Sequence, residues 1–140
     1  MKRIVSAFLF LVLAFSCATS VMAETSGEGI PTPLYTGIAS CYSDLRSNGN
    51  QMTLTGGITV WSGYTCKLTI YLEERDGYSG NWYTKSTYVA TGTATNICSI
   101  DTDITATPGH SYRGYCIFRA FDGSGNVVDE EYAYTTILFM

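Results

Sequence analysis

The sequence predicts an all-β fold of seven antiparallel strands, arranged as a sandwich of two sheets. Three observations support this prediction. Short runs of alternating apolar and polar residues recur along the chain, and segments rich in Gly, Asn, Asp and Ser separate them. Tyr and Gly are abundant, whereas charged residues make up only 14% of the sequence, a balance that favours strands over helices or disorder. A small antiparallel barrel is the alternative architecture.

Residues 1–23 have the pattern of a secretory signal peptide. Lys2 and Arg3 precede the apolar run IVSAFLFLVLAF, and VMA ends at Ala23, where small residues favour cleavage. We therefore expect cleavage near Ala23 and a secreted, cell-surface or envelope-associated protein. The apolar run is too short to span a bilayer and no second run follows it, so no permanent membrane span is expected. Lipidation of Cys17 is the alternative, although AFSC lacks the usual leucine three positions before the cysteine.

The rest of the chain divides into a polar leader at 24–34 and a domain at 35–140. The leader begins ETSGEGIPTP, and its glycines and prolines predict a flexible tether. After Ala23 the chain has six basic and twelve acidic residues, a net charge of −6. No basic cluster occurs in it, so nucleic acid is not an expected partner.

Seven strands follow in order, and each is an alternating run that ends at turn residues. DLRSNGN separates the first strand from the second, DGYSGN the third from the fourth, and DGSGN the sixth from the seventh. The predicted strands span residues 35–43, 51–60, 66–75, 82–90, 96–104, 112–121 and 127–138.

Alternation along each strand assigns its side chains to two faces. The second strand, for example, places mostly threonines opposite its apolar residues. The residues expected to share the core are Met52, Leu54, Ile58 and Val60 of the second strand, Cys66, Leu68, Ile70 and Leu72 of the third, Cys98, Ile100 and Ile104 of the fifth, and Tyr112, Cys116, Phe118 and Ala120 of the sixth.

Seven short strands at this spacing are typical of an immunoglobulin-like or fibronectin-type sandwich. In the usual order, strands one, two and five share one sheet, and strands three, six and seven share the other. The match to true immunoglobulin domains is incomplete. The second strand has no cysteine, and Gly114 stands where the Tyr-x-Cys corner needs a tyrosine.

The segments GHSYRGYCIFRAFDGSGNVVDEEYAYT, CKLTIYLEERDGYSGNW and ASCYS resemble a group of small exported bacterial immunoglobulin-like proteins and domains of unknown function. The resemblance covers roughly residues 36–136 and rests on turn and packing positions. It implies a sandwich fold and export, and it carries over no activity and no catalytic residue.

Four cysteines follow the signal peptide, and an even number in an exported chain predicts two disulfides. Cys66 and Cys98 begin strands at the same end of facing sheets, so we favour Cys66–Cys98 together with Cys41–Cys116. The pairing of Cys41 with Cys98 and of Cys66 with Cys116 remains open. The wide spacings contain no CxxC motif, so no metal site is predicted.

We expect no catalytic residue and no cofactor. The single histidine, His110, precedes Cys116 by six positions, but an extended strand separates two such residues by roughly 20 Å at about 3.3 Å per residue. The segment DGSGNV alternates oxygen-bearing residues as a calcium loop does, yet it has Val127 where that loop needs glycine, so a hairpin turn is the preferred interpretation.

The outer face of strands three, six and seven is unusually apolar and aromatic for a solvated sheet. A hairpin centred on Ser124 pairs Arg119 with Asp129 and puts Glu130 inward near Phe118, so we expect a β-bulge or an edge location there. The candidate binding face consists of Tyr71, Arg113, Tyr115, Ile117, Arg119 and Phe121.

Together these features predict an exported, non-enzymatic module that binds a protein or glycan partner at the cell surface. A purely structural, envelope-associated domain is the alternative. Carbohydrate binding is a further alternative, because exposed aromatic rings stack on sugars. Its candidate residues are Trp61 and Tyr64 in one loop, and Tyr78, Trp82 and Tyr83 at another tip. Among the classes of function, a hydrolase ranks third, after a binding module and a structural domain, since no convergent set of catalytic groups stands out.

Overall fold

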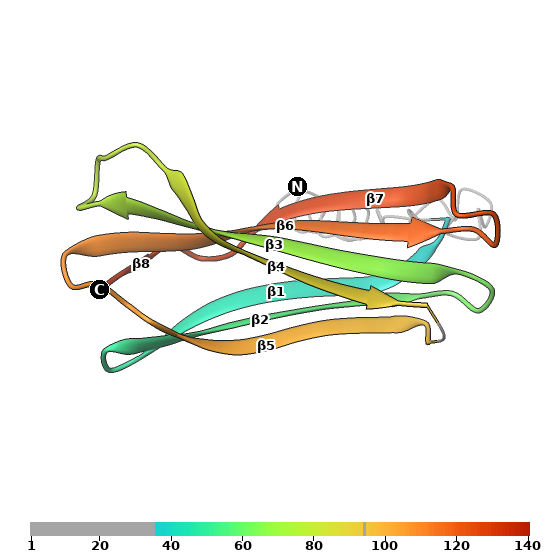
Figure 1. The fold of residues 1–140 in the computed structure, drawn as a ribbon, viewed down its shortest axis with the longest axis horizontal. Helices are drawn as coiled ribbons and strands as arrows, with labels where there is room; N and C mark the ends of the chain where they lie inside the picture. The colour runs from blue at the N-terminus through green and yellow to red at the C-terminus, as the bar shows by residue number, and fades with distance from the viewer. Residues whose placement is uncertain (1–35, 94) are drawn as a thin grey trace, which may run out of the picture. The chain divides into compact units, whose positions relative to one another are not determined.

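The computed structural model describes residues 36–93 and 95–140 (Figure 1). The signal peptide predicted at 1–23 and the leader predicted at 24–34 lie outside these residues. No helix within them is long and apolar enough to cross a membrane. The strands are β1 (Ile38–Asn48), β2 (Gln51–Val60), β3 (Thr65–Asp76), β4 (Tyr83–Gly92), β5 (Ile97–Thr105), β6 (His110–Phe121), β7 (Val127–Tyr134) and β8 (Leu138–Phe139).

The strands form two antiparallel sheets that lie in two layers (Figure 1). One sheet has the order β1-β2-β5. The other has the order β4-β3-β6-β7, and β8 also pairs with β6, at Ser111 and Tyr112. The predicted partition of strands one, two and five against three, six and seven is confirmed, and β4 joins the second sheet. The described chain is therefore all-β, with sheets of three and five strands.

The first hairpin is longer and tighter than predicted. DLRSNGN was expected to be a loop, but β1 continues to Asn48, which pairs directly with Gln51 of β2. The two-residue connection begins with Gly49, whose φ of 63° is open to glycine because it has no Cβ. Polar residues extend β1 without cost because this half of the edge strand is largely solvent-exposed.

The predicted last strand, 127–138, is interrupted, which gives eight strands in place of seven. The break lies at Thr135, whose side chain is buried. The Thr135 hydroxyl accepts a hydrogen bond from the Gly114 amide at 2.8 Å, and the Thr135 amide donates to the Gly114 carbonyl at 2.9 Å. These bonds hold the chain against β6 beyond the end of β7, and strand pairing with β6 resumes in the same direction at β8.

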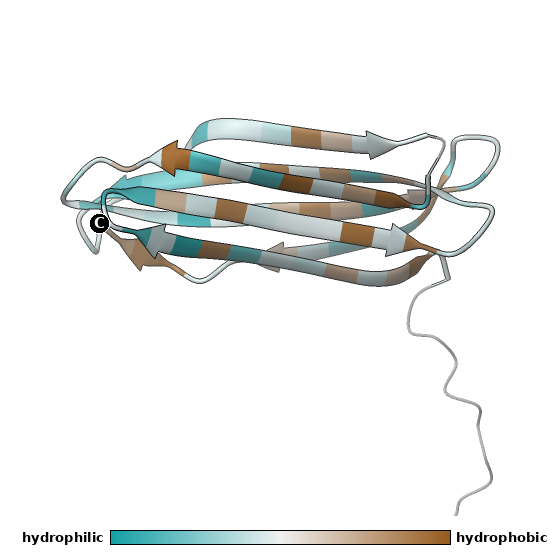
Figure 2. Cartoon of the chain, turned by 90° about the horizontal axis from the view of Figure 1, so that it is seen from below, coloured by the Kyte–Doolittle hydropathy of each residue, from teal (hydrophilic) through white to brown (hydrophobic). Residues whose placement is uncertain are grey.

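The core lies between the sheets and consists largely of alternate apolar residues of β2, β3 and β6, which are buried. Figure 2 shows apolar bands along the strands. Ile100 and Ile104, expected in the core, are only half-buried because β5 is an edge strand. Full burial of a side chain such as Phe118 contributes about 1.5–3 kcal/mol. The buried apolar residues are Ile38, Leu45, Met52, Leu54, Ile58, Val60, Cys66, Leu68, Ile70, Leu72, Cys98, Ala106, Tyr112, Cys116, Phe118 and Ala120.

Candidate binding face

The six residues of the predicted binding face lie on the outer surface of the five-stranded sheet. Antiparallel pairing of β3 with β6 places Tyr71 opposite Tyr115 and Glu73 opposite Arg113. The neighbouring inward positions on both strands belong to the core, so alternation directs this set outward. The six side chains, all half-buried, are Tyr71, Arg113, Tyr115, Ile117, Arg119 and Phe121.

Four tyrosines form a stack across β3, β6 and β7. The ring centroid of Tyr115 lies 6.1 Å from that of Tyr71, 4.9 Å from that of Tyr134 and 6.2 Å from that of Tyr132. The planes of each pair are within 29° of parallel. Tyr132 and Tyr134 are each at least half exposed, so the stack presents aromatic surface to solvent.

Trp82 continues this row between two arginines. The guanidinium carbon of Arg75 lies 4.4 Å from the indole centroid and that of Arg113 lies 4.3 Å from it. Arg113 also lies 4.4 Å from the ring centroid of Tyr134, and its Nε donates to a carboxylate oxygen of Glu73 at 2.6 Å. Cation–π contacts and an ion pair therefore fix Arg113 in place.

A β-bulge in β7 brings a second ion pair onto the same surface. The register shifts between Ala120 and Phe121, which confirms the expected bulge. The predicted pairing of Arg119 with Asp129 was wrong, however. Arg119 pairs with Glu130. Asp129 instead accepts hydrogen bonds from the backbone at the start of β1. Hydrogen bonds from Tyr132 and Arg119 lower the pKa of Glu130, so this carboxylate stays ionised.

We call this outer surface of the five-stranded sheet the aromatic face. It comprises the six predicted residues together with Lys67, Glu73, Arg75, Trp82, Glu130, Tyr132 and Tyr134. Its basic residues outnumber its acidic ones, although the chain as a whole is acidic. Four of the six basic residues in the described part of the chain lie on it: Lys67, Arg75, Arg113 and Arg119. Its acidic residues are Glu73 and Glu130. The predicted set omitted other members of the aromatic face. Alternation in the third strand pointed to Lys67 and Arg75, whereas the hairpin register centred on Ser124 put Tyr132 and Tyr134 inward. Trp82 was named only as a carbohydrate-binding candidate.

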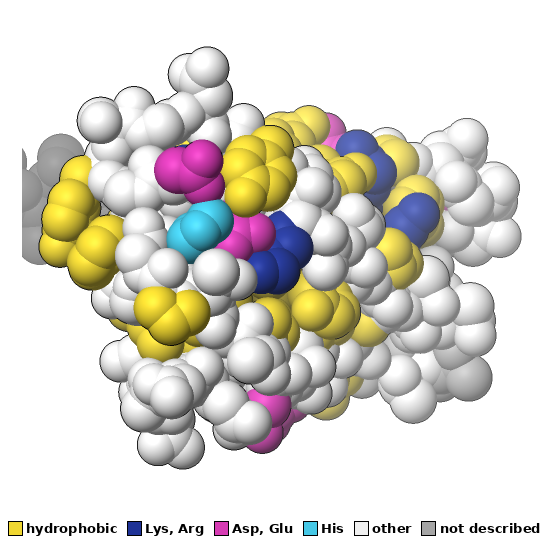
Figure 3. Space-filling model, turned by 60° about the vertical axis from the view of Figure 1, so that its left-hand side comes forward, with side chains coloured by type: hydrophobic (Ala, Val, Ile, Leu, Met, Phe, Trp, Pro, Cys, Tyr) yellow, Lys and Arg dark blue, Asp and Glu magenta, His cyan; other side chains and the backbone are white. Residues whose placement is uncertain are grey.

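A buried polar cluster lies between the strands at one end of the five-stranded sheet. Figure 3 shows its histidine beside acidic and basic side chains. Only 6% of the Glu74 side chain is exposed, and its carboxylate accepts hydrogen bonds from the Tyr112 hydroxyl and from Lys85 Nζ at 3.1 Å. His110 Nδ1 lies 3.2 Å from both Glu74 and Asp76.

Hydrogen bonds and opposite charges keep Glu74 and Lys85 ionised. Burial alone would raise the pKa of the Glu74 carboxyl, but the hydrogen bonds from Tyr112 and Lys85 outweigh burial, so the pKa is lowered. Burial alone would lower the pKa of Lys85, but its hydrogen bonds to Glu74 and Tyr112 raise it. Because Glu74 is occupied by its neighbours, the cluster has the character of a structural ion pair.

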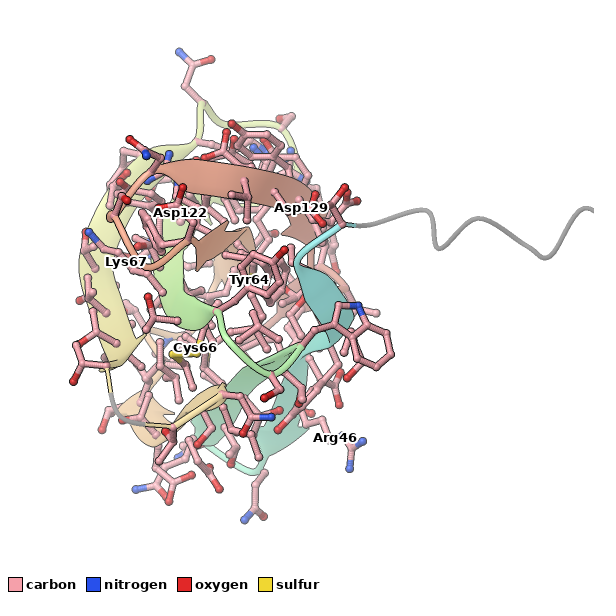
Figure 4. All side chains as sticks on the ribbon, turned by 90° about the vertical axis from the view of Figure 1, so that its right-hand side faces the viewer. Arg46, Tyr64, Cys66, Lys67, Asp122 and Asp129 are labelled. Atoms are coloured by element: carbon pink, nitrogen blue, oxygen red, sulfur yellow. A yellow bond between two sulfur atoms is a disulfide. The ribbon has the colours of Figure 1, made fainter. Side chains whose placement is uncertain are left out.

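The cysteines form one disulfide where two were predicted. Cys66 and Cys98 are bonded and join the two sheets, as the favoured pairing required (Figure 4). The second bridge is wrong for this structure: Cys41 and Cys116 are free thiols. Burial raises the pKa of both thiols, and the carboxylates of Glu131 and Asp129 raise that of Cys41 further.

Of the other sequence candidates, Trp82 joins the aromatic face, and the rest are not part of it. Within the described residues, no cluster of three His, Cys, Asp or Glu residues could hold a metal ion. Asp122 accepts hydrogen bonds from the amides of Ser124 and Asn126, as expected of a hairpin turn. Tyr78 is 70% exposed and stacks on Phe139, with ring centroids 4.1 Å apart.

Comparison with known proteins adds no assignment: no protein-family model matches the chain, and no curated protein matches it. The function is therefore inferred from the faces and clusters described above.

Proposed function

We propose that the chain is an exported, non-enzymatic, immunoglobulin-like β-sandwich that acts as a protein-binding or cell-surface interaction module, and that the aromatic face is its binding surface. The observation that carries this proposal is the continuous row of Trp82, arginine and tyrosine side chains across three strands. Trp, Tyr and Arg are the residues that most often dominate the binding energy of protein interfaces.

The other sheet provides an internal comparison. The outer face of β1, β2 and β5 carries Thr53, Thr55 and Asp103, and the Thr53 hydroxyl donates to Asp103 at 2.6 Å. This is the ordinary composition of a solvated sheet face. Both outer faces belong to one domain, yet only one of them displays an aromatic row, which supports a binding role for that face over a purely structural domain.

The fold and the disulfide support the remaining parts of the proposal. The two-sheet partition supports an immunoglobulin-like sandwich. It also agrees with membership of the small exported bacterial proteins that the sequence resembles. Export through a signal peptide cleaved near Ala23 agrees with the Cys66–Cys98 bridge, since disulfides persist in oxidising compartments.

Carbohydrate binding remains the second candidate, at a different place. Trp61 is 50% exposed at the end of β2. A hollow of about 560 Å³ lies in the same loop region, lined by hydroxyl and amide side chains that include Ser62, Tyr64 and Asn96.

The proposal is tested by truncating the exposed tyrosines of the aromatic face. Tyr132 is 50% exposed and Tyr134 is 56% exposed, so serine at both positions removes contact area and leaves the core intact. In affinity capture from the medium and envelope of the native host, we expect the double variant to recover at least tenfold less of the partner that the unchanged protein enriches.

Tyr42→Ser is the matched control, because Tyr42 is 60% exposed on the opposite sheet. It should capture the partner as well as the unchanged protein. Equal recovery by the aromatic-face variant, with an unchanged circular dichroism spectrum, would rule out the aromatic face as the binding surface.

A further inference from the structure

Arg75 differs from the other two arginines of the aromatic face in the hydrogen bonding of its Nε atom. The Nε atoms of Arg113 and Arg119 each donate to a glutamate, Glu73 and Glu130 respectively. The Nε of Arg75 is shielded from solvent and has no hydrogen-bond partner among the described residues. A shielded donor without an acceptor costs free energy, and such groups in native proteins call for an explanation.

Two of the three acidic residues that flank Arg75 in the sequence are committed to other groups, and the third, Asp76, has a side chain that is 82% exposed. Glu73 pairs with Arg113, and Glu74 turns inward to Tyr112 and Lys85. Asp76 lies 3.2 Å from His110 Nδ1. The guanidinium of Arg75 is meanwhile held over Trp82, and that of Arg113 lies over the same indole. Two cations therefore share one ring with a single carboxylate beside them.

We infer that Arg75, Trp82 and Arg113 form an anion subsite of the aromatic face, which takes a carboxylate from an acidic segment of a protein partner. The inference rests on the proposed function and names the chemistry of the partner. The partner's carboxylate gives the Arg75 guanidinium a charged partner at its terminal nitrogens, since the shielded Nε is out of reach. Arg75 is only half-buried, so its guanidinium is accessible to such a group.

The surroundings of the subsite suit an acidic ligand. Lys67, Arg75, Arg113 and Arg119 outnumber the two glutamates on the aromatic face, so the surface attracts anions although the whole chain is acidic. The indole holds the guanidinium in place before the ligand arrives, which reduces the ordering cost of binding.

Trp82 provides a direct optical test, because the chain has two tryptophans and Trp61→Phe leaves only Trp82. The variant is titrated with a capped peptide that alternates Glu and Ser, and with the same peptide carrying Gln for Glu. We expect a saturable change in indole emission with the Glu peptide and at least tenfold weaker binding of the Gln peptide.

Adding Arg75→Gln should weaken binding of the Glu peptide at least tenfold. Lys67→Gln is the matched control, since it removes one charge from the same strand and face, and it should change the affinity less than threefold. Equal losses in both variants, or no saturable response, would overturn the subsite. Tighter binding of a uronic acid oligosaccharide of equal charge would overturn the protein as the source of the carboxylate.

Failure of this inference is distinguishable from failure of the proposed function. If serine at Tyr132 and Tyr134 abolishes capture of the partner but Arg75→Gln does not, the aromatic face binds and the anion subsite is wrong. If neither change affects capture, both proposals fail.

Discussion

Removal of the Cys66–Cys98 disulfide is expected to lower the free energy of unfolding by about 3–4 kcal/mol. The bond closes a loop with a sequence separation of 32 and joins the two sheets, so its loss frees the unfolded chain. A loss of this size is a large share of the 5–15 kcal/mol that stabilises most domains. Urea denaturation of the Cys66→Ala, Cys98→Ala double variant measures it.

Reduction of the unchanged protein with dithiothreitol should produce a similar loss, and the double variant should be insensitive to the reductant. Cys41→Ala serves as the control, because Cys41 is a half-buried free thiol. An unchanged denaturation midpoint after verified reduction would show that the bridge does not stabilise the domain.

Glu74→Gln is expected to cost about 1–3 kcal/mol at pH 7, because it leaves Lys85 and Tyr112 without their charged acceptor. It should also change the pH dependence. The folded pKa of Glu74 lies below its unfolded value, so its contribution is present above the unfolded pKa and is lost as pH falls through the folded pKa. The variant should therefore lose less stability between about pH 5 and pH 3.

At the alkaline end the sign is reversed. The pKa of Lys85 is raised on folding, so its contribution is complete below its unfolded pKa and is lost as pH rises through the folded pKa. Asp101→Asn, at an exposed carboxyl of β5, should keep the acid dependence of the unchanged protein. The electrostatic account of the cluster is wrong if Glu74→Gln and the unchanged protein lose stability in parallel on acidification.

Alternation in the sequence was sufficient to predict the sheet partition and much of the aromatic face. Side chains on β3 and β6 follow a strict period of two, and their pairing is in register from Thr65 opposite Phe121 to Asp76 opposite His110. A residue assigned outward from the sequence, such as Tyr115, is therefore outward in the structure, and its neighbour Cys116 is buried.

Features that depend on irregular pairing could not be predicted in the same way. The register shift in β7 decides that Glu130, and not Asp129, meets Arg119. A second shift, between Leu72 and Glu73, leaves Lys85 without a pairing partner on β3 and lets it reach Glu74. The inward position of Glu130 signalled the first shift without giving the resulting pairs, and the second shift has no local sequence signal.

Trp82 shows a related limit. Alternation along a strand at 82–90 puts Trp82 on the inward side, but the indole lies against Arg75 and Arg113. The register shift at Lys85 is the reason. It pairs Thr84 with the outward Glu73, so the alternation toward the start of β4 is reversed.

The measurement that tests the binding face most directly is site-specific photo-crosslinking in the native host. A benzophenone amino acid replaces Tyr132 on the aromatic face in one variant and Tyr42 on the opposite sheet in another, both at exposed positions. The proposal predicts a discrete crosslinked protein from position 132 and none from position 42. The same adduct from both positions, or an adduct from position 42 alone, would contradict it.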